Sequence, residues 1–300
     1  MKRNYILGSL WIVIALLLTF LLISGFEGSN KTKRGLHNFS KWLEKNIDDS
    51  DWDDDWDDEA GEEDYMKSEI NTQQTNEYEA VGIRNIETNL RSIAVEVSES
   101  TDSKIHIDFE DGAEKRVLIT NSGSRILVKE MKKKGHLFMS GKVLISLPGD
   151  YSESIDIESV SGSVKIRDIS LREAEIQAVS GSVNISNCDI ERLEIEAVSG
   201  SIKMEGNYKS VSAQSVSGSI RLESSSELSG RCSFESVSGS VSLAIPASCG
   251  YEMEYESMSG SFKDEITGLS GSKRGSSRNG NGDAKITVNT VSGSIKIEKR

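Results

Sequence analysis

The stretch that decides the fold is VSAQSVSGSIRL, residues 211–222, in which two runs of alternating apolar residues flank a Ser-Gly-Ser triplet. Its central phrase returns along the C-terminal half of the chain, as SVSGSVKI at 159, AVSGSVNI at 178, AVSGSIKM at 197, SVSGSVSL at 236, SMSGSFKD at 257 and TVSGSIKI at 290. Such self-similarity is typical of repeat proteins, in which each repeat stacks on its neighbours and buries a shared core. The sequence therefore predicts a repeat architecture.

The spacing of the central glycines gives the length of one repeat. Successive glycines are 19, 19, 18, 21, 21 and 33 residues apart, at Gly162, Gly181, Gly200, Gly218, Gly239, Gly260 and Gly293. A repeat of about twenty residues fits one coil of a β-solenoid. Because the chain also has only 2 prolines and 6% aromatic residues, we expect an all-β fold, a β-helix-like solenoid of about seven coils over residues 151–300.

Alignment on the glycines separates inward from outward positions. Apolar residues stand seven and five positions before each glycine: Ile155/Ile157, Ala174/Ile176, Leu193/Ile195, Val211/Ala213, Cys232/Phe234, Met253/Tyr255 and Ile286/Val288. The residue three before it is always small, and those two before and two after it are apolar again, so the alternation shifts by one residue. A shift of phase marks a bend. Each coil is therefore predicted as strand, corner, strand, with glycine permitting unusual dihedrals or close packing and serines bonding neighbouring coils.

Two outward columns carry charge on either side of the corner. Four residues before the glycine the column reads Glu158, Gln177, Glu196, Gln214, Glu235, Glu256 and Asn289. Three residues after it the column reads Lys165, Asn184, Lys203, Arg221, Ser242, Lys263 and Lys296. One hypothesis is that these acidic and basic stripes contact charged envelope polymers or a protein partner. The alternative is that they are solvated faces that keep the solenoid soluble.

The regions next to the repeats complete the expected domain. Residues 81–150 hold five alternating segments, expected as antiparallel or cap strands that seal the first coil: Ile93–Val97, Lys104–Phe109, Val117–Thr120, Ile126–Val128 and Val143–Leu147. Residues 267–283 are rich in Gly, Ser and Asn, which predicts a projecting loop. The triplet Ser270–Ser272 inside that loop lacks the preceding apolar columns and is not counted as a coil.

The N-terminal quarter predicts an anchor and a spacer. After a short tail, residues 1–4, residues 5–26 (YILGSLWIVIALLLTFLLISGF) carry no charge and are long enough for a transmembrane helix; a cleaved signal peptide is the alternative. Residues 27–47 form a juxtamembrane segment with amphipathic spacing. Residues 48–80 are expected to be an acidic disordered linker, serving as a solvated spacer or as a segment that binds cations or a basic partner.

The repeats also carry a family resemblance. The V-S-G-S-[IV]-x-[IL] coils, the Leu147-Pro148 pair before them and the closing NTVSGSIKIEK (289–299) resemble a bacterial β-strand-repeat family labelled "putative adhesin", a domain of unknown function. The resemblance runs from about Ile83 to the C-terminus. It implies a membrane-tethered β-solenoid of envelope proteins, some linked to envelope-stress responses, and it supplies no catalytic residues. The long acidic linker departs from the family's pattern.

No pattern in the sequence predicts catalysis. His37, His106 and His136 are scattered, and the serines recur in every coil, which indicates architecture rather than a nucleophile. The cysteines, Cys188, Cys232 and Cys249, are expected to be free thiols, because Cys188 and Cys249 lie three coils apart. No catalytic residue, metal or cofactor site is predicted.

The predicted function follows from these features. We expect a non-enzymatic, single-pass membrane protein of the cell envelope with its C-terminal domain outside, adhesin-like or accessory to envelope-stress signalling. A self-assembling scaffold is the alternative, and a polysaccharide-acting β-helix enzyme is a third class. The partners expected are the membrane and a cell-wall polymer or envelope protein. Nucleic acid is not expected, because the formal net charge is −13.

Overall fold

The computed structural model describes residues 76–131 and 141–300. The expected tail, transmembrane helix and juxtamembrane segment, residues 1–47, and the linker up to residue 75 lie outside the described residues. Within the described part, no helix has the length and apolar character needed to span a bilayer. Residues 76–300 form one compact unit, which is all-β as predicted.

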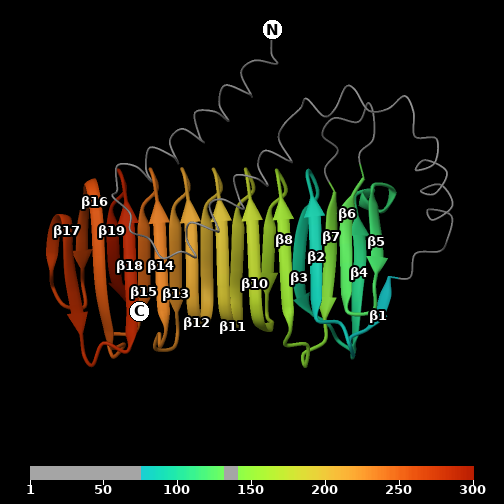
Figure 1. The fold of residues 1–300 in the computed structure, drawn as a ribbon, viewed down its shortest axis with the longest axis horizontal. Helices are drawn as coiled ribbons and strands as arrows, with labels where there is room; N and C mark the ends of the chain where they lie inside the picture. The colour runs from blue at the N-terminus through green and yellow to red at the C-terminus, as the bar shows by residue number, and fades with distance from the viewer. Residues whose placement is uncertain (1–75, 132–140) are drawn as a thin grey trace, which may run out of the picture. The chain divides into compact units, whose positions relative to one another are not determined.

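Each coil of the unit contributes one strand to each of two parallel sheets (Figure 1). The first sheet precedes the Ser-Gly-Ser corner and contains β8 (Ser154–Ser159), β10 (Ser170–Ala178), β14 (Arg231–Ser236), β18 (Ala284–Thr290) and the second halves of β11 (Val183–Ala197) and β12 (Ile202–Ser215). The second sheet follows the corner and contains β9 (Val164–Arg167), β13 (Ile220–Ser224), β15 (Val241–Ile245), β19 (Ile295–Lys299) and the first halves of β11 and β12. Strand, corner, strand is thus confirmed.

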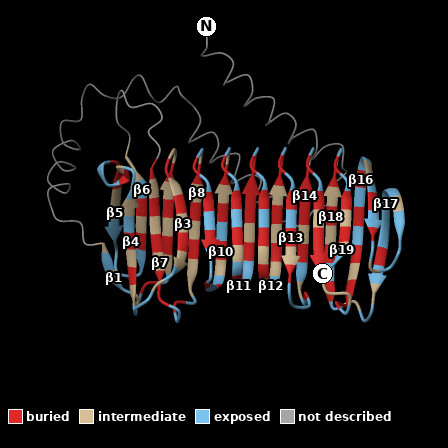
Figure 2. Ribbon diagram, turned by 180° about the vertical axis from the view of Figure 1, so that it is seen from behind, coloured by how far each residue is buried: buried red, intermediate tan, exposed pale blue. Residues whose placement is uncertain are grey.

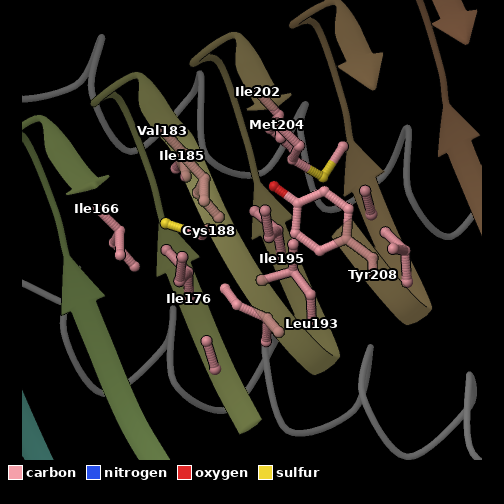
Figure 3. Close-up of a cluster of buried hydrophobic side chains, with 14 of the residues drawn as sticks. Ile166, Ile176, Val183, Ile185, Cys188, Leu193, Ile195, Ile202, Met204 and Tyr208 are labelled. Atoms are coloured by element: carbon pink, nitrogen blue, oxygen red, sulfur yellow. The ribbon is translucent and has the colours of Figure 1, made fainter. Parts of the chain in front are cut away.

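The strand register confirms the predicted core columns. Leu193 pairs with Ala174 on one side and with Val211 on the other, and every residue predicted seven or five positions before a glycine is buried. In Figure 2 buried and exposed residues alternate along the strands. Figure 3 shows one section of the interior, where Ile176, Ile195 and Tyr208 meet the side chains of the opposite sheet. β-Branched residues at alternate positions favour this pleated, one-sided burial.

The Ser-Gly-Ser corner depends on close packing and not on unusual dihedrals. None of the seven corner glycines has a positive φ. A Cβ atom on Gly181, Gly200 or Gly218 would instead overlap the carbonyl oxygen of the glycine one coil before. The serine hydroxyls bond neighbouring coils as predicted: Ser238 Oγ, for example, donates to the carbonyl oxygen of Val216 at 3.2 Å.

One predicted core column is buried in only two coils. The residue two before the glycine was expected to face inward, and Val198 and Val216 are buried, yet Met258 is 52% exposed and Val160, Val179, Val237 and Val291 are only half-buried. The small residue before it already fills the inside of the corner: Ser236, for example, is buried and its Oγ accepts from the Gly239 N–H at 2.9 Å. In the other five coils the next side chain is therefore partly or fully exposed.

The N-terminal region differs from the expected cap. β2 (Asn85–Leu90) and β3 (Ala94–Glu99) form a full coil parallel to β8 and β9, and β6 (Arg125–Glu130) and β7 (Lys142–Leu147) form another coil outside it. The prediction of cap strands at 93–97, 126–128 and 143–147 was wrong, because these segments continue the parallel sheets. Antiparallel strands cap the end: β4 (Lys104–Glu110) on β7, β5 (Val117–Asn121) on β6, and β1 (Glu77–Glu79) on β4. A short 3-10 turn (Ala113–Lys115) joins β4 to β5. β1 falls within residues 48–80, so the prediction of disorder was wrong for Glu77–Glu79.

At the C-terminal end, as at the N-terminal end, the coils are not stacked in the order in which they follow one another along the chain. The last coil, β18 with β19, lies between β14–β15 and β16 (Tyr251–Asp264), which runs through its corner and belongs to both sheets. The 33-residue glycine spacing reflects this detour. β17 (Ser270–Asn279) pairs antiparallel with β16, so the projecting loop predicted at 267–283 is largely a capping strand. Its Ser-Gly-Ser triplet is not a coil, as expected.

Candidate functional site

A second bend lies at the ends of the second-sheet strands, opposite the Ser-Gly-Ser corners. Six residues after three successive corner glycines stand Asp168, Asn187 and Gly206, with φ of 57°, 53° and 155°. Asp, Asn and Gly are the residues that adopt left-handed backbone most readily. The repeated bend turns the chain out of the sheet, and it leaves a hollow beside the column of bends.

This hollow has a volume of about 330 Å³ and extends across five adjacent strands. We call it the corner groove, after the second bend of the coil and not after the Ser-Gly-Ser corner. Its walls come from the end of β3, the residues that directly follow β9 and β13, and the middle of β11 and β12, and these five strands are hydrogen-bonded in the order β3, β9, β11, β12, β13. The turn after β7 and the start of β10 complete the lining. Adjacent strands lie about 4.8 Å apart, so four steps give the groove a length of roughly 19 Å along the solenoid axis. An extended ligand could therefore contact several coils at once. The polar lining residues are Glu99, Asp168, Ser170, Asn187, Asp189, Glu205, Asn207 and Ser225.

Hydrogen bonds hold part of the groove wall in place and leave other groups open. Asn187 Nδ2 donates to Asp168 Oδ1 at 2.8 Å, and Arg300 pairs with Glu205 at 3.3 Å. By contrast, Asn207 Oδ1 is buried without a hydrogen-bond partner. Asp189 is exposed and takes no part in any ion pair of the described residues. Buried acceptors without a partner are rare and call for one, so the groove offers acceptors to donor groups of a ligand.

The groove has acceptors but no evident nucleophile. Burial raises the pKa of the Cys188 thiol above its ordinary value, which disfavours the thiolate that nucleophilic attack requires. The nearest approach to a catalytic pair elsewhere is His106 Nε2 with Asp102 Oδ1 at 2.8 Å, on the exposed N-terminal cap. Among residues 76–131 and 141–300, no cluster of three His, Cys, Asp or Glu could hold a metal ion. The acceptors of the groove can form hydrogen bonds with hydroxyl and amino groups.

Most basic residues of the column three positions after the glycine form ion pairs with glutamates. Arg221 pairs with Glu223 at 2.7 Å and with Glu298 at 3.3 Å, and Lys296 pairs with Glu298 at 2.5 Å. Lys203 and Lys263 have glutamate partners of the same kind, at Glu205 and Glu265. Carboxylates two residues further along the strand thus pair with Lys203, Arg221, Lys263 and Lys296, which weakens the attraction of this part of the stripe for distant anions. Lys165 is the exception, because Arg167 stands two residues after it.

The glutamates at the centre of the acidic column form no ion pairs within the described residues. Glu196 and Glu235 are 4% and 5% exposed. Burial raises their pKa to about 8 and about 7, and neighbouring carboxylates add to the effect at Glu196. Both Glu196 oxygens lack a hydrogen-bond partner. This column therefore carries less negative charge near neutral pH than its sequence indicates.

The cysteines and histidines of the chain take no part in a metal-binding cluster of the described residues. Cys188, Cys232 and Cys249 are free, as predicted, and all three are buried. His37 and His136 lie outside the described residues. The corner groove itself was missed, although a signal was present: Asp168, Asn187 and Gly206 share one phase of the repeat and one tolerance for left-handed backbone.

Comparison with known proteins places the unit among similar folds. Residues 83–298 match the model of the family described as Toastrack DUF4097, a domain of unknown function. A search of the curated proteins finds no match. Similar solved structures include a "putative adhesin" from Bacteroides fragilis NCTC 9343, which is 17% identical with a TM-score of 0.47 and matches over 74% of this chain and 94% of that one.

Two further structures have comparable coverage. A "putative cell adhesion protein" from Clostridium sporogenes ATCC 15579 is 16% identical, with a TM-score of 0.36, over 74% of this chain and 96% of that one. A "putative lipid binding protein" from Parabacteroides distasonis ATCC 8503 is 16% identical, with a TM-score of 0.40, over 74% of this chain and 94% of that one.

Proposed function

Since the chain belongs to the Toastrack DUF4097 family, whose function is open, we propose that it is a non-enzymatic, membrane-anchored envelope protein that binds a linear polar polymer in the corner groove. The single observation that carries the proposal is the groove itself, which presents carboxylate and amide acceptors from successive coils along the solenoid axis. A polyhydroxylated polymer of the cell wall would supply donors to these acceptors along its length. Adhesin-like binding of this kind needs a surface and no catalytic group.

The shape of the groove supports a linear ligand over a compact one. Its residues recur from coil to coil, as in the pair of Asp168, directly after β9, with Asn187 on β11, and the pair of Asp189 on β11 with Asn207 on β12. A ligand with its own repeating units can make similar contacts with several coils. Each hydrogen bond to a charged group contributes about 1.5–3 kcal/mol, so a few such contacts give measurable affinity.

The groove proposal is tested by titrating the purified full-length chain with soluble peptidoglycan fragments in a calorimeter. We expect Asp189→Asn to weaken binding about tenfold or more, because a charged acceptor is lost. Glu254→Gln is the matched control, since Glu254 is exposed on the first sheet far from the groove. Equal binding by the wild type and Asp189→Asn would remove the groove from the account, and no binding at all would remove the polymer.

Anchoring and topology form a separate part of the proposal. The uncharged residues 5–26 support a single membrane pass, and the short tail before them resembles that of a signal-anchor, which favours a solenoid outside the cell. Protease added to intact cells should degrade the solenoid while a cytoplasmic marker protein survives. Protection of the solenoid until the cells are lysed would place it inside and exclude a role on the cell surface.

A further inference from the structure

The capping strand β17 has an open edge. It pairs with β16 on one side, and no other strand of the described residues pairs with it. The six residues from Arg274 to Asn279 pair without interruption with Glu256 to Tyr251, so their backbone is regular. In an antiparallel strand, alternate residues direct their N–H and C=O groups to each side. Half of these groups therefore point to the open side, where another extended segment could bind.

The side chains of β17 give this edge one sign of charge. Its ten residues hold Lys273, Arg274 and Arg278 and no acidic residue. Arg274 lies opposite Glu256, and Arg278 lies opposite Glu252, on the outer face of the first sheet. Within residues 76–131 and 141–300, Lys273 and Arg274 form no ion pair or side-chain hydrogen bond. Arg278 Nη2 donates to the carbonyl oxygen of Asn281 at 3.1 Å. Glutamates thus lie opposite both arginines on the β16 side, whereas no strand of the described residues lies on the open side.

The positive charges of β17 determine which kind of extended strand can pair with its open edge. If a second copy of β17 paired antiparallel about Ser276, Arg274 of one copy would lie opposite Arg278 of the other, and like charges opposite each other are unfavourable. The bulge at Lys273, where φ is 69°, also limits the regular edge to the six residues after it. Self-pairing is therefore disfavoured, whereas an acidic strand would repeat the arrangement that β16 already makes.

We propose that β17 is an acceptor for β-strand addition by an extended acidic segment of another envelope protein, with two carboxylates four residues apart. Residues opposite Arg274 and Arg278 in the docked strand would share its outer face and pair with the two guanidinium groups, from the same register positions that Glu256 and Glu252 occupy in β16. Main-chain hydrogen bonds would supply affinity, and the two charge pairs would supply register and selectivity. This surface is separate from the corner groove.

The test uses the full-length chain and a fluorescent synthetic peptide of alternating threonine and valine, with two threonines four residues apart replaced by glutamates. We expect binding that is lost when one alternate set of peptide nitrogens is methylated and kept when the other set is methylated, because only one set faces β17. If binding is absent, or is equally insensitive to both methylations, strand addition is wrong, and in the second case the site is a simple polyanion site.

A charge exchange is the second arm of the test. The double variant Arg274→Glu/Arg278→Glu should bind the glutamate peptide about tenfold more weakly and should gain binding to the matching lysine peptide. Gained binding also shows that the variant is folded. If the wild type binds both peptides equally, the arginines do not select the partner and the proposal fails.

Discussion

The carbonyl oxygen of Gly218 lies where a Cβ atom of Gly239 would stand, well inside van der Waals contact. The same relationship joins Gly200 to Gly218 on the preceding coil, so the corner glycines form one column. A Cβ atom in this column cannot be accommodated by a side-chain rotation, because the group it meets is backbone. The Ser-Gly-Ser triplet is therefore required by the distance between coils.

The first prediction concerns this column. Gly239→Ala should lower the free energy of unfolding by about 1–3 kcal/mol or more, because the backbone of two coils must separate to admit the methyl group. Urea unfolding, with the midpoint and slope fitted together, measures the change. Ser240→Ala is the control, since Ser240 is exposed in the same triplet and should change stability little. Equal effects of both changes would contradict the steric account.

The second prediction concerns the coil that lacks a Ser-Gly-Ser triplet. Glu130 accepts hydrogen bonds from Arg91 N at 2.7 Å and Ser92 N at 2.9 Å, and pairs with the buried Arg116 at 3.1 Å. Glu130→Ala should cost about 3–5 kcal/mol, because it leaves a buried guanidinium without its carboxylate.

The exposed pair Lys104–Glu77 provides the control for Glu130. Glu77→Ala should cost at most about 1 kcal/mol, since surface ion pairs contribute little. Thermal or urea unfolding of both variants decides the point. A loss for Glu130→Ala no larger than that for Glu77→Ala would show that the N-terminal coils do not depend on the buried pair.

The third prediction concerns pH. Asp264 is 1% exposed, and its carboxylate accepts from the Tyr251 and Ser277 hydroxyls, each at 2.6 Å. Burial alone would raise the pKa of Asp264, but these hydrogen bonds and those from the Thr267 side outweigh it and lower the pKa. A lowered pKa in the folded state means that stability is present above the ordinary Asp pKa of about 3.9 and is lost as pH falls through the folded value.

Asp264→Asn should therefore destabilise the chain at pH 7 by about 1.5–3 kcal/mol, the contribution of hydrogen bonds to a charged group. The difference from the wild type should shrink as the pH is lowered below the ordinary pKa, because the wild-type carboxyl then becomes protonated too. Urea unfolding across this pH range measures it. A difference independent of pH would mean that the charge of Asp264 plays no part.

The fourth prediction separates a binding module from a self-assembling scaffold. Both ends of the solenoid are closed by antiparallel strands, β5 and the three-residue β1 at one end and the arginine-bearing β17 at the other. Short and like-charged edges oppose edge-to-edge association. In sedimentation velocity the full-length chain in detergent should keep one sedimentation coefficient as its concentration rises. Filaments that grow with concentration would favour the scaffold.

The sequence predicted the interior of the solenoid better than its ends. Columns such as Ile155, Ala174 and Leu193 could be predicted because each coil repeats the same periodicity and the register follows from it. The coil order at the ends could not, because spacing alone does not say whether the Gly293 coil lies before or after that of Gly260. β17 was predicted to be a loop because of its glycines. In the structure, Gly271 and Gly275 are strand residues whose missing side chains leave room for the Tyr255 side chain.

The candidate site was less visible in the sequence than the core. The charged columns were found by phase, but ion pairs such as Arg221–Glu223 depend on residues two positions apart whose side chains could have pointed elsewhere. The corner groove arises from a bend and from residues distant in sequence, such as Glu99 and Asp189. Only folding brings these together, so periodicity could not reveal them.

Binding in the corner groove is the central claim, and a nuclear magnetic resonance titration of the isotope-labelled full-length chain with soluble peptidoglycan fragments tests it most directly. The account predicts saturable shifts of the backbone signals of Asp168, Asp189 and Asn207, with the signals of Glu254 and Ser276 unchanged. Shifts confined to the outer faces of the sheets, or no shifts at saturating fragment, would contradict it.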